Sequence, residues 1–114
     1  MAETLCKAYY TQYNVPVKIV RIAHTYAPTM NLRNDSRVFA EFVKNIVDGE
    51  NIIMKSDGKA KRAFCYITDA TIGYFKILLE GENGEAYNVA NNKELMSISD
   101  LARLLINMYP ERKL

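Results

Sequence analysis

The chain has 114 residues, enough for one small domain that buries roughly two-thirds of the surface exposed by its unfolded form. Apolar residues make up 49% and charged residues 25%, which argues against a disordered or fibrous protein. The net charge of +2 is too small for nucleic-acid binding by bulk electrostatics. No apolar run reaches the roughly 18 residues of a membrane span and no signal-peptide pattern begins the chain, so we expect a cytoplasmic protein without nucleic-acid or membrane partners.

The first half of the chain predicts a helix, a strand, a long loop and a second helix. Apolar residues at three- and four-residue steps predict a helix over 1–14, and the lack of a preceding capping residue suggests a truncated chain. β-Branched residues predict a strand over 17–22, and proline and asparagine predict a loop over 24–36. An apolar face predicts a helix over 38–47 that ends at Gly49. The candidate N-caps of this helix are Asn34, Asp35 and Ser36.

The next segment predicts a hairpin followed by a third helix. Residues 51–55 and 62–67 are rich in apolar residues and flank a turn pattern at 56–59, so we expect two paired strands. Apolar positions over 69–79 predict a mostly buried helix, for which Thr68 is the expected cap.

The last segment predicts a short strand and a final helix. The strand is expected over 86–90. Ser97 and Asp100 have the spacing of a capping box, which predicts a helix that begins there and ends before Pro110. The resulting order, α-β-α-β-β-α-β-α, indicates a mixed α/β domain without internal repeats.

Few residues point to chemistry in this chain alone. Its five glycines fit neither a dinucleotide-binding loop nor a Walker loop. Cys6 and Cys65 lack the spacing of metal ligands, so we interpret both as free structural thiols of a reducing compartment. A single histidine and scattered carboxylates form no convincing metal site or catalytic triad. We therefore predict no catalytic residue and no metal site.

Four linked motifs nevertheless resemble one enzyme family. They are RIAHTYAP at 21–28, NDSRV at 34–38, KRAFCYITDA at 61–70 and YNVA at 87–90. They are similar to RIFNTYGP, NDGRV and TRAFQYVSD, and to a final YNVA, in the NAD-dependent nucleotide-sugar epimerases, dehydratases and decarboxylases of the extended short-chain dehydrogenase/reductase group. The resemblance runs from about residue 1 to residue 109. It implies an α/β fold that corresponds to the C-terminal part of an extended, Rossmann-type fold, with a mixed sheet, flanking helices and the substrate-binding domain.

The resemblance also implies which parts of the reaction this chain lacks. In the family, a Tyr-x-x-x-Lys pair and NAD carry out a hydride cycle on the sugar. The matching lysine would lie about two positions before Met1, so the pair and the NAD-binding half would be absent. Residues 1–114 would then be a single partial domain that binds a nucleotide-diphosphate sugar. The parent enzyme would bind NAD, and this chain alone would not. The alternative is a non-catalytic module for sugar-nucleotide binding or oligomerisation.

Six residues match the family's binding positions. Arg62 matches an arginine that binds the diphosphate, a task that suits a planar guanidinium. Asn88 matches a residue near the nucleotide, and Tyr9 and Gln12 match positions that contact the sugar nucleotide. Thr25 and Arg37 match positions near the dinucleotide.

Each assignment has a simpler structural alternative. Arg62 can be a surface arginine paired with a carboxylate, and Asn88 can cap a turn. Tyr9 can be a half-buried aromatic that covers the core, and Arg37 a residue of a helix start.

Three departures from the family pattern leave the substrate open. His24 replaces the usual asparagine, and a lone histidine is more often structural than catalytic. Ala27 replaces a glycine, and Thr29 stands where decarboxylases carry arginine. The motifs fit both UDP-glucuronate decarboxylases and dTDP-glucose 4,6-dehydratases. Because loss of the Rossmann half would uncover an apolar face, we also predict a homo-oligomer.

Overall fold

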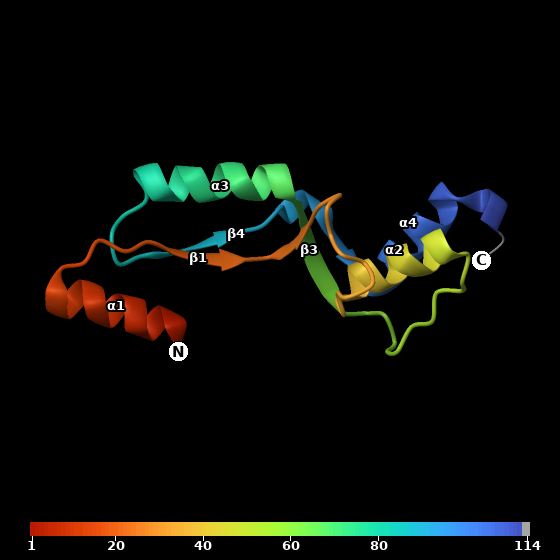
Figure 1. The fold of residues 1–114 in the computed structure, drawn as a ribbon, viewed down its shortest axis with the longest axis horizontal. Coiled ribbons are helices and arrows are strands. Elements are labelled where there is room, and N and C mark those ends of the chain that lie inside the picture. The colour runs from red at the N-terminus through yellow and green to blue at the C-terminus, as the bar shows by residue number, and fades with distance from the viewer. Residues whose placement is uncertain (113–114) are drawn as a thin grey trace.

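The elements of this chain form two groups along one axis (Figure 1). The computed structural model describes residues 1–112 and measures 58 × 24 × 24 Å. Its radius of gyration is 17.8 Å, whereas a compact domain of this length has about 13 Å. The helices and strands are α1 (Ala2–Tyr13), β1 (Ile19–Ile22), β2 (His24–Tyr26), α2 (Val38–Asp48), β3 (Lys61–Tyr66), α3 (Ile67–Glu80), β4 (Ala86–Val89), β5 (Leu95–Ser97) and α4 (Ile98–Met108), with short 3₁₀ turns at Asn92–Glu94 and Pro110–Arg112.

The first group is a two-stranded parallel sheet between two helices. β1 pairs with β4, and α1 and α3 lie on opposite sides of the pair (Figure 1). A small core of Cys65, Ala70 and Val89 fixes α3 to the sheet, with Val20 packed against it. α1 is held differently, because none of its residues is buried. The Glu3 carboxylate binds the Arg21 guanidinium of β1 through two contacts of 2.8 Å.

The second group holds the larger core. β2 pairs in parallel with β3, which pairs antiparallel with β5, and α2 and α4 pack together against this mixed sheet. The buried side chains of this core are Phe42, Ile46, Phe64, Ile98, Leu101, Ala102 and Leu105.

β3 connects the two groups because its side chains alternate between the two faces of the sheet. Phe64 lies in the α2–α4 core, and its neighbour Cys65 lies in the α3 core. On the Phe64 face, the cross-strand partners are His24 for Phe64 and Tyr26 for Tyr66. The alternation places Arg62 on that same face, at the beginning of the strand.

Several predicted features are confirmed. The family's mixed α/β architecture with flanking helices is present. The predicted helices over 1–14 and 38–47 match α1 and α2 within one or two residues. Gly49 ends α2 in a left-handed conformation with φ 73°. Ser97 and Asp100 form the capping box, in which the Ser97 hydroxyl accepts from the Asp100 N–H. Cys6 and Cys65 are both free thiols.

The predicted hairpin is wrong. Residues 51–55 form no strand, and β3 pairs instead with β2 and with β5, a strand that the sequence did not predict. Ile52 packs against the larger core as part of an irregular segment. The hydrogen-bonding edge that the hairpin would have used is taken by a segment more than thirty residues away, a tertiary contact that no local pattern reveals.

The helix starts and the long loop also need correction. α2 begins after Arg37, whose backbone is extended, although Asp35 still accepts from the Arg37 N–H. α3 begins after Tyr66 without a side-chain cap, so Thr68 lies inside the helix. The predicted loop 24–36 opens with β2, because the backbone of these residues pairs with β3.

Candidate functional site

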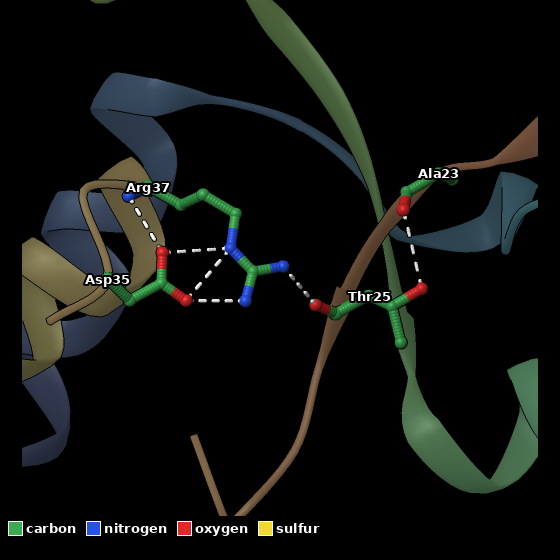
Figure 2. Close-up of polar contacts among 4 residues, drawn as sticks. All are labelled: Ala23, Thr25, Asp35 and Arg37. Atoms are coloured by element: carbon green, nitrogen blue, oxygen red, sulfur yellow. Dashed lines mark hydrogen bonds and ion pairs between the residues drawn. The ribbon is translucent and has the colours of Figure 1, made fainter. Parts of the chain in front are cut away.

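Arg37 ties the start of α2 to β2, as Figure 2 shows. Its Nε donates to both oxygens of the Asp35 carboxylate at 2.9 Å, and its Nη2 donates to Asp35 Oδ2. Its Nη1 donates to the Thr25 carbonyl oxygen at 3.1 Å. The hydrogen bonds that Arg37 donates to the Asp35 carboxylate lower the pKa of Asp35 from its ordinary value of 3.8 to about 2. Each terminal nitrogen of Arg37 has a second N–H that no described residue accepts. These two N–H groups remain available to a ligand.

Thr25 contributes its backbone to this link. Its side-chain hydroxyl donates to the Ala23 carbonyl oxygen at 3.3 Å (Figure 2). The hydroxyl lone pairs are still able to accept a hydrogen bond. Thr25 and Arg37, both predicted near the dinucleotide, therefore lie in direct contact, in a position set by β2 and the start of α2.

Arg62 lies on the strand beside this pair. Its guanidinium is exposed and donates to the carbonyl oxygen of its neighbour Lys61 at 2.9 Å. Within residues 1–112, Arg62 has no carboxylate ion-pair partner. A guanidinium without a partner carboxylate is able to form charge-assisted hydrogen bonds with an anionic ligand.

His24 opens β2, on the same face of the sheet as Arg62. Its ring centroid is 5.8 Å from that of Phe64, its cross-strand partner. The pKa of His24 is lowered, first by burial and then by the positive charges of Arg62 and Arg37. The structure brings His24, Thr25, Arg37 and Arg62 to one end of β2 and β3, and we call these four residues the cationic cluster.

Asn88 lies in a separate groove. It belongs to β4, with Arg21 as its cross-strand partner. A groove of about 780 Å³ runs between α3 and β4 and includes Asn88 and Cys65 among its lining residues. Burial raises the pKa of the Cys65 thiol, with a smaller contribution from Asp69, so this cysteine is a poor nucleophile. Arg62 does not line this groove.

Tyr9 and Gln12 lie near the end of α1. The Tyr9 ring is 5.5 Å from the Tyr13 ring, and Tyr9 is 49% exposed. The Tyr10 side chain of the same helix turn lies against Gly84 in the connection before β4. This end of the first group points away from β2 (Figure 1). In the described residues, Tyr9 and Gln12 are therefore not brought to the cationic cluster, and their binding roles stay predictions, as do those of the other four residues.

The residues present fit only one edge of a dinucleotide site. The remaining N–H groups of Arg37 and the Thr25 hydroxyl can bind a phosphate or ribose oxygen, but no glycine-rich phosphate loop is part of the sequence. Among residues 1–112 there is no cluster of three potential metal ligands. No helix in the same range is long and apolar enough to cross a membrane.

The sequence analysis missed one feature of this site, the Asp35 carboxylate that holds Arg37. The i, i+2 spacing of Asp35 and Arg37 at the start of a helix is the signal that reveals it. The position of His24 beside Phe64 depends on the pairing of β2 with β3 and has no local signal.

Comparisons with known proteins agree with this architecture. Residues 1–90 match the model of the NAD dependent epimerase/dehydratase family. UDP-glucuronic acid decarboxylase 5 of Arabidopsis thaliana is 33% identical over the whole chain, which covers 33% of that protein. The dTDP-glucose 4,6-dehydratase of Bacillus anthracis, solved in complex with NAD, superimposes with a TM-score of 0.86 at 24% identity over 96% of this chain and 34% of its own.

A third relative carries both ligands. The enzyme WbmF of Bordetella bronchiseptica, solved with NAD⁺ and UDP, superimposes with a TM-score of 0.84 at 24% identity over 95% of this chain and 35% of its own. These two structures show the fold alone. The chain spans about a third of the length of its relatives. Since the family model matches most of the sequence, the chain belongs to the NAD-dependent epimerase/dehydratase family.

Proposed function

We propose that this chain is the nucleotide-sugar-binding portion of an NAD-dependent nucleotide-sugar dehydratase, decarboxylase or epimerase. The observation that carries the proposal is Arg62, an exposed guanidinium on β3 that has no carboxylate partner among residues 1–112. A diphosphate presents several oxygens in a small volume, and a planar guanidinium can bind two of them at once. The UDP bound to WbmF supports this class of ligand.

The same proposal assigns the chain no complete reaction of its own. The sequence contains no glycine-rich phosphate loop, and its Tyr-x-x-x-Lys spacing at 109–113 lies outside the four family motifs. Residues 1–114 would act as one partial domain, and in the parent enzyme NAD would bind mainly through residues outside this chain, with Thr25 and Arg37 at one edge of its site. In the relatives, this length of chain is only about a third of the protein. We place the protein in the cytoplasm, where nucleotide sugars and reduced thiols are both expected.

A second candidate function is an oligomerisation module. α1 and α3 expose large apolar side chains, among them Leu5 and Leu79, which are 59% and 77% exposed. Such faces on a protein of small net charge favour association. Under this alternative, the chain would form homo-oligomers with or without nucleotide.

Calorimetric titration with UDP, dTDP and NAD tests the proposal. We expect one of the two pyrimidine nucleotides to bind, with no heat of binding for NAD. Arg62→Ala should weaken nucleotide binding by about tenfold to a hundredfold, since a hydrogen bond to a charged group contributes about 1.5–3 kcal/mol.

Arg33→Ala is the matched control for this titration. Arg33 is 80% exposed and lies 3.9 Å from Asp48 at the far end of α2, so its loss removes the same charge away from the cationic cluster. Nucleotide affinity should be unchanged in this variant. Equal weakening by both substitutions, or no binding of either nucleotide, would contradict the proposed function.

A further inference from the structure

β1 has one edge that pairs with β4 and one edge that does not pair. The backbone N–H groups of Ile19 and Ala23 donate to the β4 side. Because alternate residues of a strand direct their backbone groups to opposite edges, Lys18, Val20 and Ile22 direct theirs away from β4. Among residues 1–112 no third strand pairs with them. We call this row of backbone groups the free edge of β1.

The two charged side chains of β1 do not protect its free edge. Edge strands are commonly guarded by lysines or other charges that oppose pairing with a second chain. Here the Lys18 Nζ donates to the Leu78 carbonyl oxygen of α3 at 2.6 Å, and the Arg21 guanidinium binds Glu3 of α1. Both cations are therefore held by helices of their own chain.

The two flanks of α3 differ in polarity. Asp69, Lys76 and Glu80 line the groove on the β4 side of this helix. Phe75 and Leu78 lie roughly half a turn away from them, on the flank toward the free edge of β1. Both apolar side chains are more than half exposed. A polar flank is typical of a surface that faces water, whereas an apolar flank beside an unpaired strand is typical of a surface that contacts another chain.

We propose that the free edge of β1 binds the free edge of a second copy of this chain, in antiparallel orientation about a two-fold axis at Val20. In this register Val20 pairs with Val20 of the other copy, and Lys18 pairs with Ile22. The two pairs of strands then form one sheet of four strands, with the apolar flanks of both α3 helices on the same face. The inference goes beyond the proposed function, because it assigns a surface and its partner without a nucleotide.

The positions of the charges favour this register. With the axis at Val20, Arg21 of each copy lies opposite Ile19 of the other. An axis at Arg21 would place the two arginines directly opposite each other, and like charges in that position destabilise a strand pair. The axis at Val20 also pairs all three residues of the free edge.

The exposed apolar surface near the free edge approaches the area that a dimer needs. It includes Ile22 on β1, Phe75 and Leu78 on α3, and Leu5 and Tyr13 on α1, which the Arg21–Glu3 ion pair ties to β1. These five side chains expose roughly 700 Å² in each copy, close to the about 800 Å² that each partner buries in a standard interface. The backbone hydrogen bonds of the paired edges would add to this contact.

Amide hydrogen exchange tests the free edge directly. The experiment measures exchange of the Val20 and Ile22 N–H groups at two chain concentrations about a hundredfold apart, with sedimentation velocity at each. We expect dimers at the higher concentration, where exchange of both groups should slow by about tenfold or more. The Ala86 N–H is the internal control, because it points away from β1 on the opposite edge of the sheet. Its exchange should not change.

Proline substitutions separate this edge from other surfaces. Val20→Pro removes an N–H from the free edge but none that β4 uses, so it should raise the dimer dissociation constant by about tenfold or more. Ala86→Pro removes the equivalent N–H from the outer edge of β4 and should leave the dimer unchanged. Phe75→Lys alters the apolar flank without changing the backbone and should also weaken the dimer by about tenfold.

Two outcomes would overturn the inference. The first is a monomer at every concentration whose Val20 and Ile22 N–H groups exchange equally fast throughout, which would leave the edge open to a strand of another protein. The second is a dimer in which exchange of these groups does not slow, because its interface would then lie elsewhere. If Val20→Pro does not fold, the exchange rates of the unaltered chain and the Phe75→Lys variant decide the question. Nucleotide binding is measured separately, so its failure would overturn the proposed function and leave this inference standing.

Discussion

Arg37 has two possible tasks at the scale of single residues. Three of its N–H groups hold Asp35 and the Thr25 carbonyl oxygen, which makes it a structural link between α2 and β2 (Figure 2). The two remaining N–H groups are available for its predicted role near the cofactor. A residue that is already fixed by such bonds pays less conformational entropy when it binds a ligand. The structural and binding interpretations of Arg37 are therefore compatible.

The link makes a prediction about acid stability. The pKa of Asp35 is lower in the folded chain, at about 2, than its ordinary value of 3.8. Its contribution to stability is present above pH 3.8 and is lost as the pH falls through 3.8 toward 2. Asp35→Asn should therefore lower the free energy of unfolding at pH 7 but have little effect near pH 2, as measured by urea denaturation at both pH values.

Asp57→Asn provides the control. Asp57 pairs with Lys59 at 3.6 Å in an irregular segment where both side chains are largely exposed. Such exposed pairs contribute little, so this variant should match the wild type at both pH values. A loss in Asp35→Asn that is the same at pH 7 and near pH 2 would contradict the assigned role of the carboxylate.

At the scale of elements, α4 has the most complete local signals. Its capping box satisfies two backbone N–H groups at the helix start, and four of its apolar side chains are buried. The Ser97 hydroxyl also donates to the Asp100 carboxylate at 2.6 Å, and these bonds lower the pKa of Asp100. The start of α4 is therefore specified twice, by its cap and by its packing.

Removal of this cap should be measurable. Ser97→Ala leaves the Asp100 N–H without its acceptor and should lower the free energy of unfolding by about 1 kcal/mol in chemical denaturation. Ser97→Asp retains an acceptor at the same position and should stay within a few tenths of a kcal/mol of the wild type. If the two variants are equally destabilised, the cause is packing at Ser97 and not the cap.

At the scale of the whole molecule, the chain is long and exposes much apolar surface. β1 and β4 form a parallel pair with no third strand in the described residues, although parallel sheets are generally larger and covered on both faces. α1 packs through few of its side chains, and α3 turns several apolar residues outward. The exposed ones on α3 are Ile72, Phe75, Leu78 and Leu79.

This surface predicts self-association of the chain. Sedimentation velocity over a hundredfold range of concentration should show a concentration-dependent shift to dimers or larger species. Leu79→Lys on α3 should weaken the association by about tenfold or more, since burial of one leucine contributes about 1.5–3 kcal/mol. Ile53→Lys, which changes an equally exposed residue outside α1 and α3, should have no effect. A monomer at every concentration would contradict the prediction.

The motifs and local patterns of the sequence determined the family of this protein and the positions of its helices. RIAHTYAP, NDSRV, KRAFCYITDA and YNVA led to the family, which the match over residues 1–90 confirms. Apolar periodicity located the four helices, and Gly49 and Ser97 marked the end of α2 and the start of α4, because these signals act within a few residues of chain. The binding roles of the six matched residues follow from the family resemblance and stay predictions, whereas their positions in space came only from the structure.

Strand pairing and the grouping of the site were decided only by the tertiary structure. The partners of β3 are residues 24–26 and 95–97, which are distant from β3 in the sequence. The expected hairpin with residues 51–55 therefore does not form. The same pairing carries His24 to Arg62, and a side-chain bond carries Arg37 to Thr25. The physical reason is that a helix satisfies its hydrogen bonds from its own sequence, whereas a strand needs a partner that only the folded chain supplies.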